Sequence, residues 1–162
     1  TLMESLVGAL DPDAGTVERP GDVGWCPQDD RLYDRLTVDE TFRLFGQAHD
    51  MAPDEIEAAA DRLTERLDFA RFRDRRVDRL SGGNRRKLTL AVSLMHDPEV
   101  LLLDEPYTGF DWETYLAFWD LAADLAERGT AVAVISHLVS ERDRFDRILE
   151  LRDGRLEATD DA

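Results

Sequence analysis

The sequence has 162 residues, of which 43% are hydrophobic, so one domain with a substantial buried core is expected. Its 36 acidic and 20 basic residues give a net charge of −16, which argues against DNA or RNA as the main partner, because phosphate backbones need a basic face. The single cysteine, Cys26, excludes an intramolecular disulfide and favours a reducing cytosolic compartment, and no apolar run reaches the roughly 18 residues of a membrane-spanning helix.

Lysine is nearly absent from the sequence: Lys87 is the one lysine, and every other basic residue is arginine. An acid-rich, lysine-poor surface fits concentrated salt, where screening removes the self-repulsion of so large a charge. We therefore expect a halophilic, haloarchaeal origin, with an acidic and GC-rich genome as the alternative.

The N-terminal stretch is typical of an amphipathic helix, with apolar residues at Leu2, Leu6, Val7 and Leu10. The pattern starts in mid-series at Thr1 without a capping residue, so we expect that further residues precede it. Pro12 and Gly15 end this helix, and Val17 and residues 23–26 are expected to form short strands.

The next segment is predicted to be helical throughout. Thr37 and Glu40 form a capping box at the start of one helix, and Pro53 starts another. The apolar face of the second helix consists of Ile56, Ala59, Ala60, Leu63 and Leu67. Residues 71–79 are highly charged and are expected to form a surface loop. We therefore predict a helical subdomain at approximately residues 34–80, inserted into an α/β core formed by residues 1–33 and 81–162 of a single domain.

Strands and helices alternate in the rest of the chain. A helix follows Gly83, with Leu88, Ala91, Leu94 and Met95 facing inward, and another follows Gly109, with a stripe of Tyr115, Trp119, Ala122 and Ala126. Continuously apolar residues 100–103 and 131–135 predict strands buried on both faces, and residues 148–151 predict a further strand. This alternation indicates an α/β fold with a mainly parallel sheet.

Two carboxylates, Asp104 and Glu105, directly follow the apolar strand. Ligands bind at the carboxyl ends of strands in open α/β sheets, and paired acids there suit a metal ion and an attacking water. The simpler interpretation is a strand that ends in solvated acids, which is common in so acidic a chain.

A serine and two glycines, Ser81, Gly82 and Gly83, open the helix that follows them. Backbone N–H groups at such a helix start can hold an anion such as phosphate, although the serine also serves as an ordinary helix cap. The triplet alone is weak evidence of a site.

Three further polar residues are candidates with equally ordinary alternatives. Gln28 follows a strand and could sense Mg²⁺ and the attacking water, or be a solvated loop amide. His137 follows another strand and could donate to a γ-phosphate, or be a histidine at a sheet edge. Asp111 would ordinarily be a helix N-cap.

The order and spacing of these features resemble those of the ATP-binding-cassette ATPases over nearly the whole chain. Gln28 resembles the family's Q-loop, and Ser136-His137 its switch histidine. The signature, Walker B motif and D-loop are matched by Leu80-Ser81-Gly82-Gly83-Asn84, by Val100 to Pro106 and by Gly109-Phe110-Asp111.

The resemblance implies a P-loop NTPase-like core and a role for each matched residue. Asp104 would hold Mg²⁺ through water, Gln28 would be a Mg²⁺ ligand, Glu105 would be the general base and His137 would contact the γ-phosphate. Ser81, Gly82 and Gly83 would bind ATP held by a second ABC ATPase subunit, and Asp111 would cross the interface between the two subunits.

The sequence departs from the family pattern at two places. Tyr107, Phe110 and Trp112 replace the small residue, the leucine and the proline that are more usual there. Thr1 matches the residue just after the P-loop, next to the nucleotide, so the preceding strand, the P-loop and its lysine are missing. We therefore expect the 162 residues alone to bind ATP poorly and to hydrolyse it hardly at all.

The resemblance also implies partners and a location. The chain would be the ATP-hydrolysing subunit of a transporter that drives export through a transmembrane permease, with ATP and Mg²⁺ as cofactors, no nucleic acid partner, and a place in the cytoplasm on the inner face of the membrane. Residues 32–37 and the run after Asn84 favour exporters. The alternatives are a soluble ABC-type ATPase that acts on nucleic acid or ribosomes, and an inactive interaction fragment.

Overall fold

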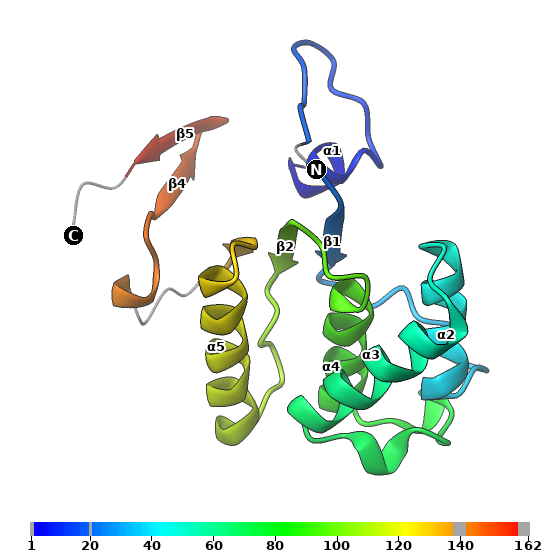
Figure 1. Cartoon of the computed structure of the whole chain (residues 1–162). Helices are drawn as coiled ribbons and strands as arrows, with labels where there is room; N and C mark the ends of the chain where they lie inside the picture. The colour runs from blue at the N-terminus through cyan, green and yellow to red at the C-terminus, as the bar shows by residue number, and fades with distance from the viewer. Residues whose placement is uncertain (1, 20, 138–141, 159–162) are drawn as a thin grey trace.

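The computed structural model describes residues 2–19, 21–137 and 142–158. A three-stranded parallel sheet lies at its centre, made of β1 (Val23–Cys26), β2 (Val100–Asp104) and β3 (Ala131–Ile135), with β2 in the middle (Figure 1). Cys26 is paired with Leu103, and Asp104 with Ile135, so the carboxyl ends of the three strands meet at one edge. The expected α/β fold with a parallel sheet is confirmed.

Within the described residues, five α-helices surround this sheet or extend from it: α1 (Leu2–Val7), α2 (Val38–Ala48), α3 (Pro53–Arg66), α4 (Gly82–Leu94) and α5 (Trp112–Glu127). The predicted capping box starts α2, because the Glu40 amide donates to Thr37 Oγ1 at 3.1 Å and the Thr37 amide donates to the Glu40 carboxylate at 2.8 Å. The predicted apolar face of α3 is buried at all five of its positions. These local patterns are confirmed.

Helix α4 lies between the sheet and the helices α2 and α3. It is buried on all sides from Arg86 to Leu94. The predicted inward stripe was therefore too narrow, because a helix with the sheet on one side and helices on the other has no solvent face.

Gly24 marks the closest approach of α4 to the sheet. A Cβ atom there would lie 2.1 Å from the main-chain oxygen of Ser93, which belongs to α4. We expect Gly24→Ala to lower the free energy of unfolding by about 1–3 kcal/mol, because strand and helix must move apart. Urea unfolding measures this change. Gly82→Ala is the control, since a Cβ at Gly82 meets nothing within 4 Å; equal losses in the two variants would contradict the steric argument.

Three local predictions were wrong in detail. Helix α1 ends at Val7 rather than near Leu10, and the residues around Val17 form no strand. The loop at 71–79 contains two short 3-10 helices, η1 (Ala70–Phe72) and η2 (Val77–Arg79), and Val77 is fully buried. The many charges of this segment concealed two apolar residues that contact the core, Val77 and the partly buried Phe72.

Helix α5 buries a wider stripe than the one predicted. Trp119 is buried, and Tyr115 and Ala122 are partly buried and pack against the core, as expected. Its buried residues are Thr114, Phe118, Trp119, Leu121 and Leu125, whereas Ala126 is exposed. The predicted stripe was too narrow and extended one residue too far, because the pattern within α5 could not show how much of the helix the core covers.

The C-terminal strand does not extend the parallel sheet. After a 3-10 turn, η3 (Arg142–Arg144), strand β4 (Leu149–Arg152) pairs antiparallel with β5 (Arg155–Ala158) in a hairpin. Every residue of both strands is exposed, and Figure 1 shows the hairpin apart from the central sheet. The predicted strand exists, but its partner is its sequence neighbour.

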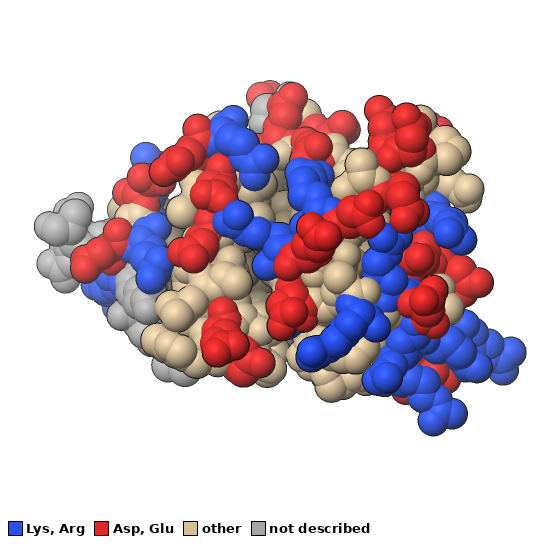
Figure 2. All heavy atoms as spheres, turned by 60° about the horizontal axis from the view of Figure 1, so that its bottom comes forward, with Lys and Arg blue, Asp and Glu red and all other residues tan. Residues whose placement is uncertain are grey.

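The surface carries charges of both signs. Figure 2 shows acidic side chains spread over the face in view, with basic side chains between them and gathered at one corner. Among the described residues, no helix is both long enough and apolar enough to cross a membrane.

Candidate functional site

The sheet edge brings Glu105 and His137 together. Glu105 follows β2, and its carboxylate accepts a hydrogen bond of 2.7 Å from the main-chain N–H of His137, which follows β3. The hydroxyl of Ser136 lies 3.4 Å from the other carboxylate oxygen, and the imidazole Nε2 of His137 lies 3.9 Å from the first. The Glu105 side chain is 13% exposed and that of His137 is 91% exposed. The site thus offers a sheltered carboxylate beside an imidazole open to a ligand.

The backbone of Glu105 has an unusual conformation. Its φ is +48°, in the left-handed region, and its N–H donates to the Ile135 carbonyl at 2.9 Å. The other non-glycine residues with positive φ in the described chain are all aspartates. Aspartate tolerates this conformation better than glutamate does, and strained residues of this kind cluster at functional sites.

Gln28 lies in the loop after β1, close to the same edge. Its side chain is exposed, and its carbonyl accepts a hydrogen bond of 3.1 Å from Arg86. The same guanidinium binds the carbonyls of Asp104 and Glu105. Arg86 therefore joins the loop of Gln28 to the main chain at the end of β2.

A second group of predicted residues forms a separate cavity of about 340 Å³. Ser81 caps α4 by accepting a hydrogen bond from the Asn84 amide at 3.3 Å, and a Cβ at Gly83 would lie 3.2 Å from the Gly109 carbonyl. The residues that line the cavity are Asp68, Arg71, Ser81, Gly83, Asn84, Lys87, Gly109, Phe110, Asp111 and Thr114. Glu105 and His137 do not line it, so the predicted residues fall into two groups.

Asp111 is the N-cap of α5, as its ordinary interpretation predicted. Its carboxylate accepts a hydrogen bond of 2.8 Å from the Thr114 amide, and this bond lowers the pKa of the Asp111 carboxyl. The cap holds Asp111 ionised at the rim of the cavity. Thr1, the remaining candidate, lies outside the described residues.

Arg85 connects α4 to the loop after Gln28. It donates to both carboxylate oxygens of Asp30, at 2.6 and 2.9 Å, and to Asp34 at 2.7 Å. The hydrogen bonds from Arg85 hold the pKa of Asp30 below its ordinary value of 3.8. Bidentate pairs of this kind fix geometry as well as charge.

We expect Asp30→Asn to lower the free energy of unfolding by about 1 kcal/mol at pH 7, because a half-buried charged hydrogen bond is lost. A lowered carboxyl pKa stabilises the fold above the unfolded value and is lost as the pH falls through the folded value. The difference from the unmodified chain should therefore shrink as urea unfolding is repeated below pH 3.8.

Asp34→Asn is the matched control, because Asp34 binds the same arginine but its side chain is 64% exposed. Its effect should be smaller at every pH. A difference for Asp30→Asn that stayed constant down to acid pH would contradict the assigned cause.

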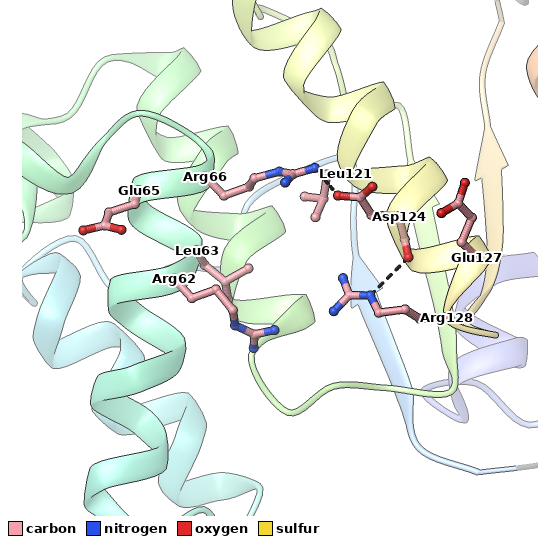
Figure 3. Close-up of a pocket in the computed structure, with 8 residues that line it drawn as sticks. All are labelled: Arg62, Leu63, Glu65, Arg66, Leu121, Asp124, Glu127 and Arg128. Carbon is pink, nitrogen blue, oxygen red and sulfur yellow. Dashed lines mark hydrogen bonds and ion pairs between the residues drawn. The ribbon is translucent and has the colours of Figure 1, made fainter.

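A larger cavity, of about 780 Å³, contains none of the predicted residues. Figure 3 shows it as a groove between α3 and α5, with Leu63 and Leu121 among charged side chains. Arg66 of α3 forms an ion pair with Asp124 of α5 across it, and Arg128 Nε donates to the Asp124 carbonyl at 3.1 Å. Its arginines and acids balance in number, which gives no preference for a charged ligand.

Sequence reasoning missed the part that two residues, Arg86 and Tyr107, play in the site. Arg86 carried no signal, because a basic residue near a helix start is usually solvated. Tyr107 stood out in the sequence only as a departure from the family pattern. In the structure its side chain is hydrogen-bonded with Ser136, and burial raises the pKa of its phenol. The Ser136 hydroxyl is thus shared between Tyr107 and Glu105.

Comparisons with known proteins agree in one family. A family model described as ABC transporter matches residues 1–108. The chain is 34% identical over 168 residues to ABC transporter G family member 20 of Dictyostelium discoideum, covering 96% of the chain and 23% of that protein. It is 38% identical over 155 residues to Nod factor export ATP-binding protein I of Rhizobium meliloti, covering 93% of the chain and 45% of that protein.

Solved structures show the same fold. The structure of an ATP-binding subunit of an ABC transporter has a TM-score of 0.89 at 20% identity, covering 96% of this chain and 70% of that one. A dimeric bacterial ABC transporter cassette has a TM-score of 0.75 at 25% identity, covering 84% of this chain and 61% of that one. The chain spans less than two thirds of the length of the curated relatives that it matches.

Proposed function

Because the chain belongs to the ABC transporter family, we propose that it is the ATP-binding and ATP-hydrolysing part of a transporter that exports its substrate through a membrane permease. The observation that carries this proposal is the meeting of Glu105 and His137 across the ends of β2 and β3. A carboxylate beside an exposed imidazole suits the activation of water next to a γ-phosphate.

In this proposal Glu105 is the general base and His137 a γ-phosphate contact. Ser136 and the His137 amide orient the Glu105 carboxylate, and the partly buried position shields it from bulk water. A carboxylate held by two hydrogen-bond donors has a fixed orientation, so its remaining lone pairs favour a single position for the attacking water.

Oxygen atoms available at this edge fit Mg²⁺. Mg²⁺ keeps several waters and is usually bound by one or two carboxylates together with phosphate oxygens of the substrate. Gln28 would be a protein ligand of the ion, and Asp104 would hold it through water. The ion would neutralise charge on the phosphates.

The cavity around Ser81 and Gly83 would serve ATP bound to a second ABC ATPase subunit. Free N–H groups at the start of α4 suit a phosphate, and Asp111 at the rim would contact the partner. This division explains why Glu105 does not line that cavity. We further propose that residues 34–80, which carry α2 and α3, act as the helical subdomain that links this signature to the permease.

The relatives named as Nod factor export proteins support export as the direction of transport. A permease partner would place the chain at the inner face of the cell membrane. The P-loop that grips the phosphates would come from residues N-terminal to Thr1, as the resemblance places it, and ATP turnover belongs to the protein that contains them.

The proposal is tested by reading the codons before Thr1 and by measuring ATP hydrolysis of the encoded protein with Mg²⁺, alone and with the permease encoded beside it. We expect a glycine-rich loop that ends in Gly-Lys-Ser or Gly-Lys-Thr, and turnover that needs Mg²⁺ and responds to the permease. A stop codon directly upstream would favour an inactive interaction fragment. Turnover stimulated by RNA or ribosomes and not by the permease would favour the soluble ATPase.

A further inference from the structure

Arg86 is a buried cation with an unusual set of partners. It lies in the second turn of α4 and is 7% exposed. Its five N–H groups face five main-chain carbonyls: Nε donates to Pro106 at 3.2 Å, Nη1 to Gln28 at 3.1 Å and to Pro27, and Nη2 to Glu105 at 2.9 Å and to Asp104. Every donor of the guanidinium is therefore used.

These carbonyls come from two separate segments of the chain. Pro27 and Gln28 follow β1, whereas residues 104–106 are the last residue of β2 and the two residues after it. Among the described residues, no carboxylate forms an ion pair with Arg86, so its direct partners are main-chain carbonyls, while the Asp30 carboxylate attracts it from a longer distance. Burial of a charge is costly unless it is fully hydrogen-bonded, which means that both loops must stay in place for the arginine to be stable there.

Helix α4 also begins at the cavity lined by Ser81 and Gly83, one turn before Arg86. The same rigid helix thus presents Ser81 to a partner and Arg86 to the strand ends. We propose that Arg86 is a positioning residue that holds the Gln28 loop and the Asp104–Glu105 strand end in one register and ties both to the helix that starts at the signature. This inference rests on the proposed function.

Other side chains cannot reproduce these contacts. Lysine has the charge but only three donors on one atom, and glutamine has two donors and no charge. The planar guanidinium reaches both loops at once because its donors point outward in three directions. Lysine in Arg86→Lys should therefore still hold the two segments together in part, whereas alanine in Arg86→Ala should not hold them at all.

The first test uses Cys26, the one cysteine in the 162 residues, which directly precedes Pro27. Cys26 is fully buried, and burial raises the pKa of its thiol to about 11. Thiol labelling of the intact protein, followed by mass spectrometry of the peptide that contains Cys26, reports the opening of this loop. We expect Arg86→Ala to label at least about tenfold faster, because the loop opens locally.

Charge alone would give the opposite result. The Arg86 guanidinium lowers the pKa of Cys26, so its removal leaves less reactive thiolate. Faster labelling of Arg86→Ala must then mean that the reagent reaches the Cys26 thiol more easily. Arg73→Ala is the matched control: Arg73 binds Asp39, Glu57 and Asp61 and its side chain is 18% exposed, but it does not contact either loop.

The second test measures steady-state ATP hydrolysis of the intact protein with its P-loop. We expect Arg86→Ala to lower kcat about 100-fold with little change in KM, because a misplaced base slows the chemical step while the phosphate grip lies elsewhere. Arg86→Lys should fall between Arg86→Ala and the unmodified protein in both kcat and labelling.

The outcomes separate this inference from the proposed function. Absence of hydrolysis in the unmodified protein would overturn the proposed function, and Cys26 labelling would still decide whether Arg86 ties the loops. Unchanged labelling in Arg86→Ala, equal labelling in Arg73→Ala, or an unchanged kcat would overturn the positioning role. If Arg86→Ala does not fold, an Arg86→Lys variant with normal labelling and kcat would overturn it as well.

Discussion

Replacement of Glu105 by glutamine is expected to lower ATP turnover by about 100-fold or more while ATP binding is retained, because the amide accepts no proton from the attacking water. Glutamine keeps the shape and can still accept the hydrogen bond from the His137 amide. Phosphate release under saturating ATP, together with direct measurement of bound ATP, separates the two effects.

Glu99→Gln is the control for this variant. Glu99 is an exposed glutamate at the opposite end of β2, away from the carboxyl edge of the sheet. Its loss should leave turnover unchanged. Retention of more than about a tenth of the turnover in Glu105→Gln would assign the general base to another group.

Phe118→Ala is expected to lower the free energy of unfolding by about 3–5 kcal/mol, because it leaves a large cavity in the core. Phe118 is 1% exposed and is surrounded by Tyr107, Phe110 and Trp119, with ring centroids at 5.7, 6.4 and 5.1 Å. Urea unfolding measures the loss.

Leu116→Ala, two positions away on α5, is the comparison for Phe118→Ala. Leu116 is 37% exposed, so its truncation should cost less than about 1 kcal/mol. Similar losses at the two positions would contradict the packing argument, because alanine does not weaken helix formation at either one. Tyr107 and Phe110 flank the two halves of the site, so Phe118→Ala should loosen both.

The sequence correctly predicted features that depend on contacts between residues only a few positions apart in the chain. The capping box of Thr37 and Glu40 spans four residues, and the apolar face of α3 repeats within one helix. The end of β2 at Asp104 and Glu105 is likewise marked by an abrupt change from apolar to charged residues. In each case the physical cause lies within a few positions of its effect.

Predictions failed where the burial or the pairing of a segment depends on residues far away in the sequence. Burial of α4 on all sides depends on α2, α3 and β1, which no periodicity within α4 could reveal. Arg86 is buried because two loops, 18 to 59 residues away, supply carbonyls. Residues 148–151 were expected to add a strand to the parallel sheet, because strand propensity does not indicate which strand a segment pairs with.

The left-handed backbone at Glu105 has a consequence for the evolution of this protein. A glutamate at φ +48° costs of order 1–3 kcal/mol relative to an unstrained conformation, and glycine would avoid that cost. Selection for thermal stability alone would therefore remove the side chain to which we assign the chemistry. Persistence of glutamate at this position in a lineage would record continued demand for turnover, whereas drift to glycine would mark a copy that had been released from it.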